Sequence, residues 1–204
     1  MASPPTTCAP LSDATDGFII VDMQNDFLVE GAPLHVPGGA ALLEAINATS
    51  RTCAFRHQVA TQDWHPPQHC SFAPQGGPWP AHCVRGSPGA ELHPLLDTRY
   101  LHSIVRKGTS QESDSYSAFA DENKVTTGLA GLLHGRGVTR VFVCGVAYDY
   151  CVFFTAMDAK ASGFDVVVVS DLCAAVDRDL AQTRTATLAE AGIAVLESSA
   201  FSSA

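Results

Sequence analysis

Cys151 lies where a buried strand is expected to pass into a helix, a position suited to nucleophilic chemistry. The apolar run Val138 to Cys144 predicts the strand, and apolar residues at three- and four-residue spacing after Cys151 predict the helix. The first turn of a helix has unpaired N–H groups and the positive end of the helix dipole, which favour an anion. This place predicts a cysteine with a lowered pKa beside an oxyanion site. A buried structural thiol is the alternative.

Asp22 and Lys107 stand at the ends of two other predicted strands. A cysteine attacks as its thiolate, so it needs a base or a neighbouring positive charge. Asp22 is a candidate base and Lys107 a candidate charge, although the usual triad contains a histidine and the chain has eight. Taken singly, Asp22 could instead cap a turn, and Lys107 could be a solvated surface residue.

A second group of reactive residues lies in the segment from Gln62 to Pro94, which is rich in proline, glycine and histidine. Within twenty residues, 63–82, it holds one carboxylate and three imidazoles, the ligand types of a zinc, iron(II) or manganese site: Asp63, His65, His69 and His82. Residues two apart on an extended backbone point the same way, which suits Asp63 and His65. Loop histidines also serve as caps and hydrogen-bond donors, so a metal-free role stays open. Cys70 and Cys83 are interpreted as structural.

Aromatic side chains near these motifs could wall a small flat pocket; they are Phe27, Trp64, Phe72, Trp79 and Tyr116. Covering the edge of the core is the alternative role. The segment Asp114 to Ser117 is expected to shape the loop after Lys107.

Length and charge limit the classes of protein that this chain can belong to. With 204 residues, it predicts one domain over residues 17–204, preceded by a poorly ordered extension over residues 1–16. The formal net charge of -9 argues against nucleic acid or an anionic membrane as partner. Seven cysteines, no signal segment and no run of about 20 apolar residues predict a reduced, soluble, cytoplasmic protein.

Apolar strands alternating with helical segments predict an α/β fold, a three-layer sandwich with an open, mostly parallel sheet of about six strands. The expected strands cover residues 17–23, 57–61, 101–106, 138–144, 164–170 and 193–196. The expected helices cover residues 40–52, 125–135, 149–162 and 177–191. Ligands of such sheets bind outside the carboxyl ends of the strands, where Asp22, Lys107 and Cys151 all fall.

The chain resembles the nicotinamidases of the isochorismatase-like cysteine hydrolases from about Gly17 to its C-terminus. The resemblance rests on motifs that follow one another in order: IVDMQNDF over residues 20–27, QDWHP over 62–66, WPAHCV over 79–84, RKG over 106–108, DSYSAF over 114–119, and GVA with CV over 145–147 and 151–152. It implies an isochorismatase-like hydrolase fold. It also implies a metal-dependent enzyme that converts nicotinamide to nicotinic acid and ammonia, a step in NAD salvage, through a cysteine thioester.

The resemblance also implies roles for individual residues. Asp22, Lys107 and Cys151 would form the triad, and the N–H groups of Ala147 and Cys151 the oxyanion hole after a cis bond between Val146 and Ala147. Asp63, His65 and His82 would bind a divalent metal, zinc first and iron or manganese as alternatives, with His69 as an additional candidate ligand. The implied substrate pocket contains Phe27, Trp79, Tyr116, Val146 and Tyr150. Tyr148 departs from the family, which often has threonine there.

Three other functions stay open at this point. The chain could hydrolyse another small amide with the metal in a structural role, or be a non-catalytic relative that binds a metal or ligand. A redox role for Cys151 is the weakest alternative, because the chain has no Cys-x-x-Cys motif with it. The oligomeric state is also open, a homo-oligomer included.

Overall fold

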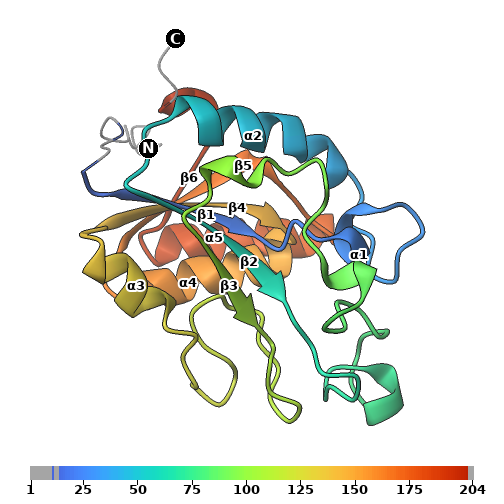
Figure 1. The fold of residues 1–204 in the computed structure, drawn as a ribbon. Helices are drawn as coiled ribbons and strands as arrows, with labels where there is room; N and C mark the ends of the chain where they lie inside the picture. Colours follow the sequence, from blue (N-terminus) through green and yellow to red (C-terminus); the bar gives the residue numbers. More distant parts are fainter. Residues whose placement is uncertain (1–10, 12–13, 202–204) are drawn as a thin grey trace.

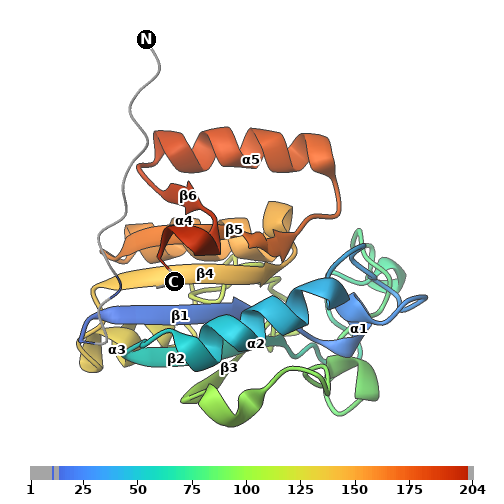
Figure 2. The same cartoon turned by 90° about the horizontal axis from the view of Figure 1, so that it is seen from above.

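The computed structural model describes Leu11 and residues 14–201, which form a six-stranded parallel sheet (Figure 1). Figure 2 shows the strand order β3-β2-β1-β4-β5-β6. The strands are β1 (Asp16–Val21), β2 (His57–Asp63), β3 (Ser103–Lys107), β4 (Arg140–Val146), β5 (Asp165–Ala174) and β6 (Ala194–Leu196). The predicted α/β class and the number of strands are therefore confirmed.

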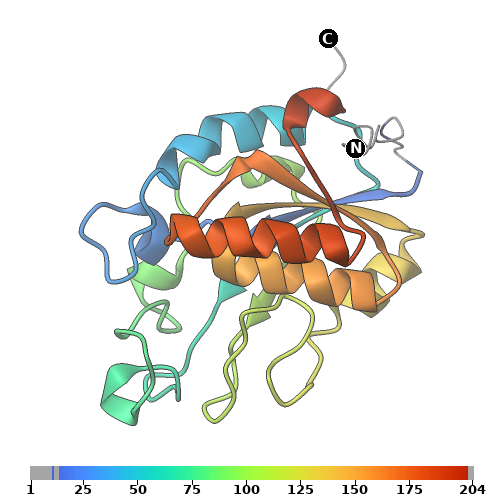
Figure 3. The same cartoon turned by 180° about the vertical axis from the view of Figure 1, so that it is seen from behind.

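Helices cover both faces of the sheet. The helix α2 (Leu43–Thr52) lies on one face, and α3 (Leu129–Gly135), α4 (Phe153–Ala161) and α5 (Arg178–Glu190) lie on the other (Figures 1 and 3). Residues of β1 alternate between the two cores, because Phe18 and Ile20 pack on the side of α2 whereas Ile19 and Val21 pack on the opposite side. Burial on both faces accounts for the unbroken apolar runs in the strands.

Several helices differ from their predicted bounds. The helix expected from Val125 begins only at Leu129, because Gly128 has a left-handed φ of 89° and Thr126 forms a bridge with Ala120. The short helix α1 (Asn25–Leu28) was not predicted. No described helix is both long enough and apolar enough to cross a membrane.

The N-terminal prediction lies mostly outside the described residues, which omit residues 1–10, 12 and 13. Asp16, counted in the expected extension, is the first residue of β1 and is buried. Its carboxylate accepts hydrogen bonds from Arg140 of the neighbouring strand, at 2.8 Å from Nε and 2.6 Å from Nη2.

The sheet changes winding direction between β1 and β4, its two central strands. The chain proceeds from β1 to β2 on one side, whereas β4, β5 and β6 extend on the other. Such a switch point opens a crevice outside the carboxyl ends of the two strands. Gly145 lets β4 approach closely there, because its φ is 112° and a Cβ atom would overlap the carbonyl of Val21. The residues after β1 and β4 therefore face one another.

Candidate active site

The ammonium of Lys107 lies at the centre of a buried cluster beyond the ends of the strands. Its Nζ lies 2.8 Å from Asp22 Oδ2 and donates hydrogen bonds to Asp63 Oδ1 at 2.5 Å and to Cys151 Sγ at 3.4 Å. A further bond reaches the Ser115 carbonyl at 3.2 Å. Lys107 and Asp22 side chains are fully buried. The structure therefore brings together the three residues predicted as a triad and adds Asp63.

Asp22 follows β1 in a left-handed conformation with φ of 52°. Thr61 of β2 holds it, because Asp22 N donates to Thr61 Oγ1 at 3.1 Å and Thr61 Oγ1 donates to Asp22 Oδ1 at 2.6 Å. The second oxygen, Oδ2, faces Lys107 as an ion contact but has no hydrogen bond of suitable direction among the described residues. Burial raises the pKa of Asp22 against the opposing effect of the Lys107 ammonium. A buried carboxylate with a raised pKa and an unoccupied lone pair is suited to accept a proton.

Cys151 lies in a π-helical turn, Tyr148–Val152, that joins β4 to α4. The lowered thiol pKa expected from the start of a helix is wrong for this structure. Burial raises the pKa of Cys151 well above its ordinary value, and the nearby Lys107 ammonium only partly opposes that effect. The thiol is therefore protonated at neutral pH and needs a base to become a nucleophile.

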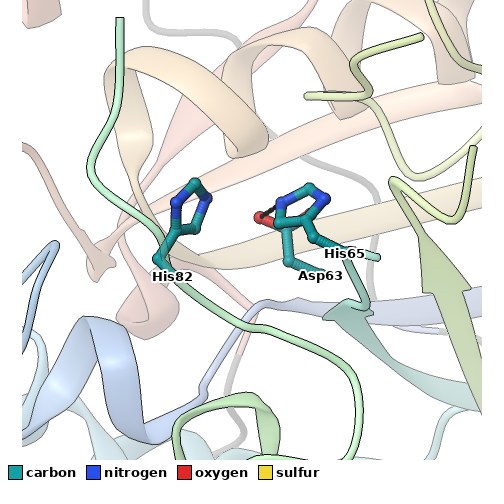
Figure 4. Close-up of side chains that lie close together, drawn as sticks. All are labelled: Asp63, His65 and His82. Atoms are coloured by element: carbon teal, nitrogen blue, oxygen red, sulfur yellow. Dashed lines mark ion pairs between the residues drawn. The ribbon is translucent and has the colours of Figure 1, made fainter. Parts of the chain in front are cut away.

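Asp63, His65 and His82 bring one carboxylate oxygen and two imidazole nitrogens within 4.8 Å of one another (Figure 4). Asp63 ends β2 and His65 follows it, so that His65 Nε2 lies 3.5 Å from Asp63 Oδ2. The Nδ1 atoms are bonded elsewhere, that of His65 to the Gly108 carbonyl at 3.0 Å and that of His82 to the Pro80 carbonyl at 2.8 Å. Backbone carbonyls commonly orient metal-binding imidazoles in this way. This donor set fits a divalent transition metal.

The charges around Asp63 favour its ionised form. Although burial opposes ionisation, the Lys107 ammonium and His65 hold the pKa of Asp63 well below its ordinary value. Burial likewise opposes protonation of Lys107, but Asp22 and Asp63 raise its pKa well above the ordinary value. Burial lowers the pKa of His82. Asp63 is thus a carboxylate and His82 a neutral imidazole, the forms in which these groups bind metals, whereas, against the opposing effect of burial, Asp63 raises the pKa of His65.

His69 lies next to the candidate metal ligands but is not brought into their group. Its ring centroid is 4.0 Å from that of His65, yet both its nitrogens have protein partners. Nδ1 pairs with Ser71 Oγ at 2.7 Å and Nε2 with the Ser113 carbonyl at 3.2 Å. Burial, and then His65, lower the pKa of His69 to about 4. In this arrangement His69 supports the loop around the site.

A cavity of about 300 Å³ opens onto Cys151 and the candidate metal ligands. Four of the five predicted pocket residues line it, namely Phe27, Trp79, Tyr116 and Tyr150. The fifth, Val146, is fully buried in the core on the side of α2. The other two aromatic candidates also lie elsewhere. Phe72 packs against the imidazoles of His65 and His82. Trp64 lies under the Arg106 guanidinium, whose Cζ is 3.7 Å from the centroid of the Trp64 ring.

Three segments distant in sequence join to form the aromatic wall of this cavity. Trp79 Nε1 donates to the Tyr116 hydroxyl at 2.9 Å, which ties two long loops together. The ring of Tyr150, from the turn that carries Cys151, packs edge-on against Trp79 with 5.3 Å between centroids. The wall is therefore fixed relative to the thiol, as a preformed ligand site requires.

The bond between Val146 and Ala147 is cis, as the resemblance implies. The Ala147 carbonyl accepts hydrogen bonds from Tyr150 N and Val152 N, both at 3.1 Å, which closes the turn below Cys151. Ala147 and Cys151 both line the cavity. Tyr148 does not line it, because its hydroxyl pairs with Thr185 Oγ1 of α5 at 2.6 Å.

Sequence reasoning missed some residues of the site. Thr61 precedes Asp63 by two positions on β2, so strand alternation could have placed both side chains on one face. The Ser115 carbonyl and the cavity wall from Ala32 to Val36 come from loops whose paths follow no local pattern. Such segments are determined by tertiary contacts.

The chain is similar in sequence and in structure to known proteins. Residues 16–200 match the Isochorismatase domain family. Nicotinamidase from Acinetobacter baylyi is 43% identical over 176 residues, covering 78% of this chain and 81% of the relative. The crystal structure of PnC1 from L. infantum in complex with nicotinate has a TM-score of 0.94 and 60% identity, covering 95% of this chain and 98% of that one. Pyrazinamidase of Pyrococcus horikoshii, solved in complex with zinc, has a TM-score of 0.81 and 38% identity. The match covers 89% of this chain and 98% of that one.

Proposed function

The chain belongs to the isochorismatase family, and on that premise we propose that it is a cysteine amidohydrolase that converts nicotinamide to nicotinic acid and ammonia. The observation that carries the proposal is the placement of Cys151, Lys107 and Asp22 beside Asp63, His65 and His82 at one cavity. A nucleophile, a base and a metal-binding group thus face the same substrate. The reaction would supply nicotinic acid to NAD salvage.

The choice of nicotinamide rests on the relatives and on the shape of the cavity. The Acinetobacter baylyi relative is a nicotinamidase, and the PnC1 structure contains nicotinate. Aromatic side chains such as Phe27 and Trp79 line the cavity and suit a flat ring. The reactive thiol and the metal-binding group border the same space, so that one small molecule can contact both.

Cys151 is the nucleophile in this proposal, and Asp22 takes its proton. The carboxylate and the thiol belong to one cluster whose polar atoms lie within 4.8 Å of one another. The raised pKa of Asp22 makes it a stronger base than an exposed aspartate, which the raised pKa of the thiol requires. Lys107 stabilises the thiolate as it forms, because its Nζ lies 3.4 Å from Sγ.

The bonds broken and formed are those of acyl transfer. The thiolate adds to the amide carbon, and the N–H groups of Ala147 and Cys151 are assigned to the resulting oxyanion. A single donor of this kind contributes about 3 kcal/mol of transition-state stabilisation. The C–N bond then breaks while Asp22 returns its proton to the leaving ammonia. Water, deprotonated by Asp22, hydrolyses the thioester and releases nicotinic acid and the thiol.

The proposal includes a divalent metal held by Asp63, His65 and His82. Zinc is the first choice because two imidazoles and a carboxylate are among its usual ligands and because the Pyrococcus horikoshii relative contains it. Iron and manganese are the alternatives. When bound, the metal supplies a Lewis-acid centre that can accept a lone pair of the substrate.

Ammonia release by the purified protein tests this function. We expect release from nicotinamide to fall after chelation and to return with zinc, iron(II) or manganese. Benzamide is the matched control substrate, since it has the same amide but no ring nitrogen. Efficient hydrolysis of other small amides, with none of nicotinamide under any metal, would contradict the proposed substrate. No hydrolysis of any amide would contradict the enzyme assignment.

The metal assignment predicts unequal effects of two neighbouring histidines. We expect His82→Ala to weaken Zn²⁺ binding by more than about a hundredfold because a direct ligand is lost, whereas His69→Ala should weaken it less than about tenfold. Titration of the metal-free proteins against a chromogenic chelator measures both. Equal losses would place His69 among the ligands, and no loss in the His82 variant would contradict the proposed site.

A further inference from the structure

Gln24 belongs to the first motif of the resemblance, and the mechanism gives it no role. Its side chain is fully buried two residues after Asp22. The side-chain amide forms two hydrogen bonds with the backbone of one residue, because Oε1 accepts from Asp63 N at 2.8 Å and Nε2 donates to the Asp63 carbonyl at 2.8 Å. Gln24 thus pairs with the end of β2 as a neighbouring strand would.

The same side chain reaches a third segment. Gln24 Nε2 also donates to the Ala90 carbonyl at 2.7 Å, in the loop that follows His82. Backbone contacts reinforce this junction, since Gln24 forms an antiparallel bridge with Leu92. One buried amide therefore links the segment of Asp22, the residue Asp63 and the loop that extends from His82.

The position of the Asp63 backbone matters because the two carboxylate oxygens of this residue contact two different neighbours. Oδ1 accepts the hydrogen bond from Lys107 at 2.5 Å, whereas Oδ2 faces His65 at 3.5 Å. A small rotation or shift of the backbone would move one oxygen toward its partner and the other away. The β2 ladder itself ends here, since Asp63 pairs with Lys107 as the last residue of the register with β3.

We propose that Gln24 is a positioning residue that holds the Asp63 backbone so that its two carboxylate oxygens serve Lys107 and the metal simultaneously. The inference rests on the proposed function, because it assigns Asp63 to the metal and Lys107 to catalysis. It concerns the affinity for the metal and the turnover, and it gives Gln24 no contact with the substrate.

Gln62 offers a matched control for the effect of losing a buried amide. Its Nε2 donates to the same Ala90 carbonyl at 3.1 Å, and its side chain is buried in the adjacent position of β2. The side chain of Gln62 has no hydrogen bond to the Asp63 backbone among the described residues. Comparing Gln24→Ala with Gln62→Ala therefore separates the hold on Asp63 from a general weakening of the loop.

The test measures Zn²⁺ affinity of the metal-free proteins with a chromogenic chelator, together with thermal unfolding, and kcat and KM at saturating Zn²⁺. We expect Gln24→Ala to weaken Zn²⁺ binding by about 10- to 100-fold, and Gln62→Ala to leave it within about threefold, at comparable unfolding temperatures. At saturating Zn²⁺, Gln24→Ala should lower kcat more than it raises KM, because the Lys107 contact remains disturbed.

A second variant covers the case in which Gln24→Ala does not fold. Gln24→Glu keeps the size and the acceptor for Asp63 N but loses both donated bonds, so the same loss of affinity is expected. Equal Zn²⁺ affinities of the Gln24 and Gln62 variants would overturn the inference, as would a wild-type protein that binds no Zn²⁺. Zn²⁺ affinity is measured separately from ammonia release. If the protein does not hydrolyse nicotinamide, the effect of Gln24 on Zn²⁺ binding can therefore still be interpreted.

Discussion

Cys151→Ala is expected to abolish ammonia release from nicotinamide while leaving metal binding unchanged. In the proposed mechanism the thiol is the nucleophile; its Sγ lies 3.4 Å from Lys107 Nζ, and the side chain is outside the group formed by Asp63, His65 and His82. Without a nucleophile no thioester forms, and losses of such residues lower kcat by more than about a thousandfold. The substitution is small, so the folded structure should be retained.

Single-turnover and steady-state ammonia assays on zinc-loaded protein, with metal content measured in parallel, check this prediction. Cys144→Ala is the control, because it removes another fully buried thiol, on β4, that does not line the cavity. We expect that variant to keep the wild-type kcat. Residual turnover within tenfold of wild type in Cys151→Ala would assign the attack to another group, such as a metal-activated water.

The sequence was sufficient to predict the residues at the carboxyl ends of strands. Asp22 and Cys151 follow apolar runs whose burial on both faces is a local signal, and topology then brings parallel strand ends to one edge. From the sequence, Lys107 was assigned to the candidate triad and Asp63 to the candidate metal ligands. The structure joins them, because the register of β2 and β3 pairs Asp63 directly with Lys107. Register depends on contacts across the sheet, which no single segment specifies.

Other features could not be predicted because tertiary contacts override local preference. The pKa of Cys151 depends on its burial, a property of the assembled core, whereas position at the start of a helix suggested the opposite direction. The hydrogen bonds of His69 arise from Ser71 and from the distant Ser113. Composition alone could not separate this supporting histidine from the two candidate ligands.

Lys107→Met is expected to destabilise the fold and to abolish turnover. Methionine fills similar space but leaves the carboxylates of Asp22 and Asp63 buried without the ammonium that lies 2.8 Å from one and 2.5 Å from the other. Removing one partner of a buried ion pair costs about 3–5 kcal/mol of unfolding free energy. Lys160→Met is the control, because its surface contact with Asp165 at 3.9 Å should contribute less than about 1 kcal/mol.

The loss of stability in Lys107→Met should depend on pH with a defined sign. In the wild type the pKa of Asp63 lies below its ordinary value, so its contribution to stability is complete above that value and falls as the solution becomes more acidic. In the variant, burial without a counter-charge raises the pKa of both carboxyls, so acid stabilises the variant relative to its behaviour at neutral pH. The difference in unfolding free energy between the two proteins should therefore narrow from pH 7.5 to pH 5 in urea unfolding of the metal-free proteins. A difference in unfolding free energy that widens toward pH 5 would mean that Lys107 does not stabilise the ionised forms of Asp22 and Asp63 in the buried site.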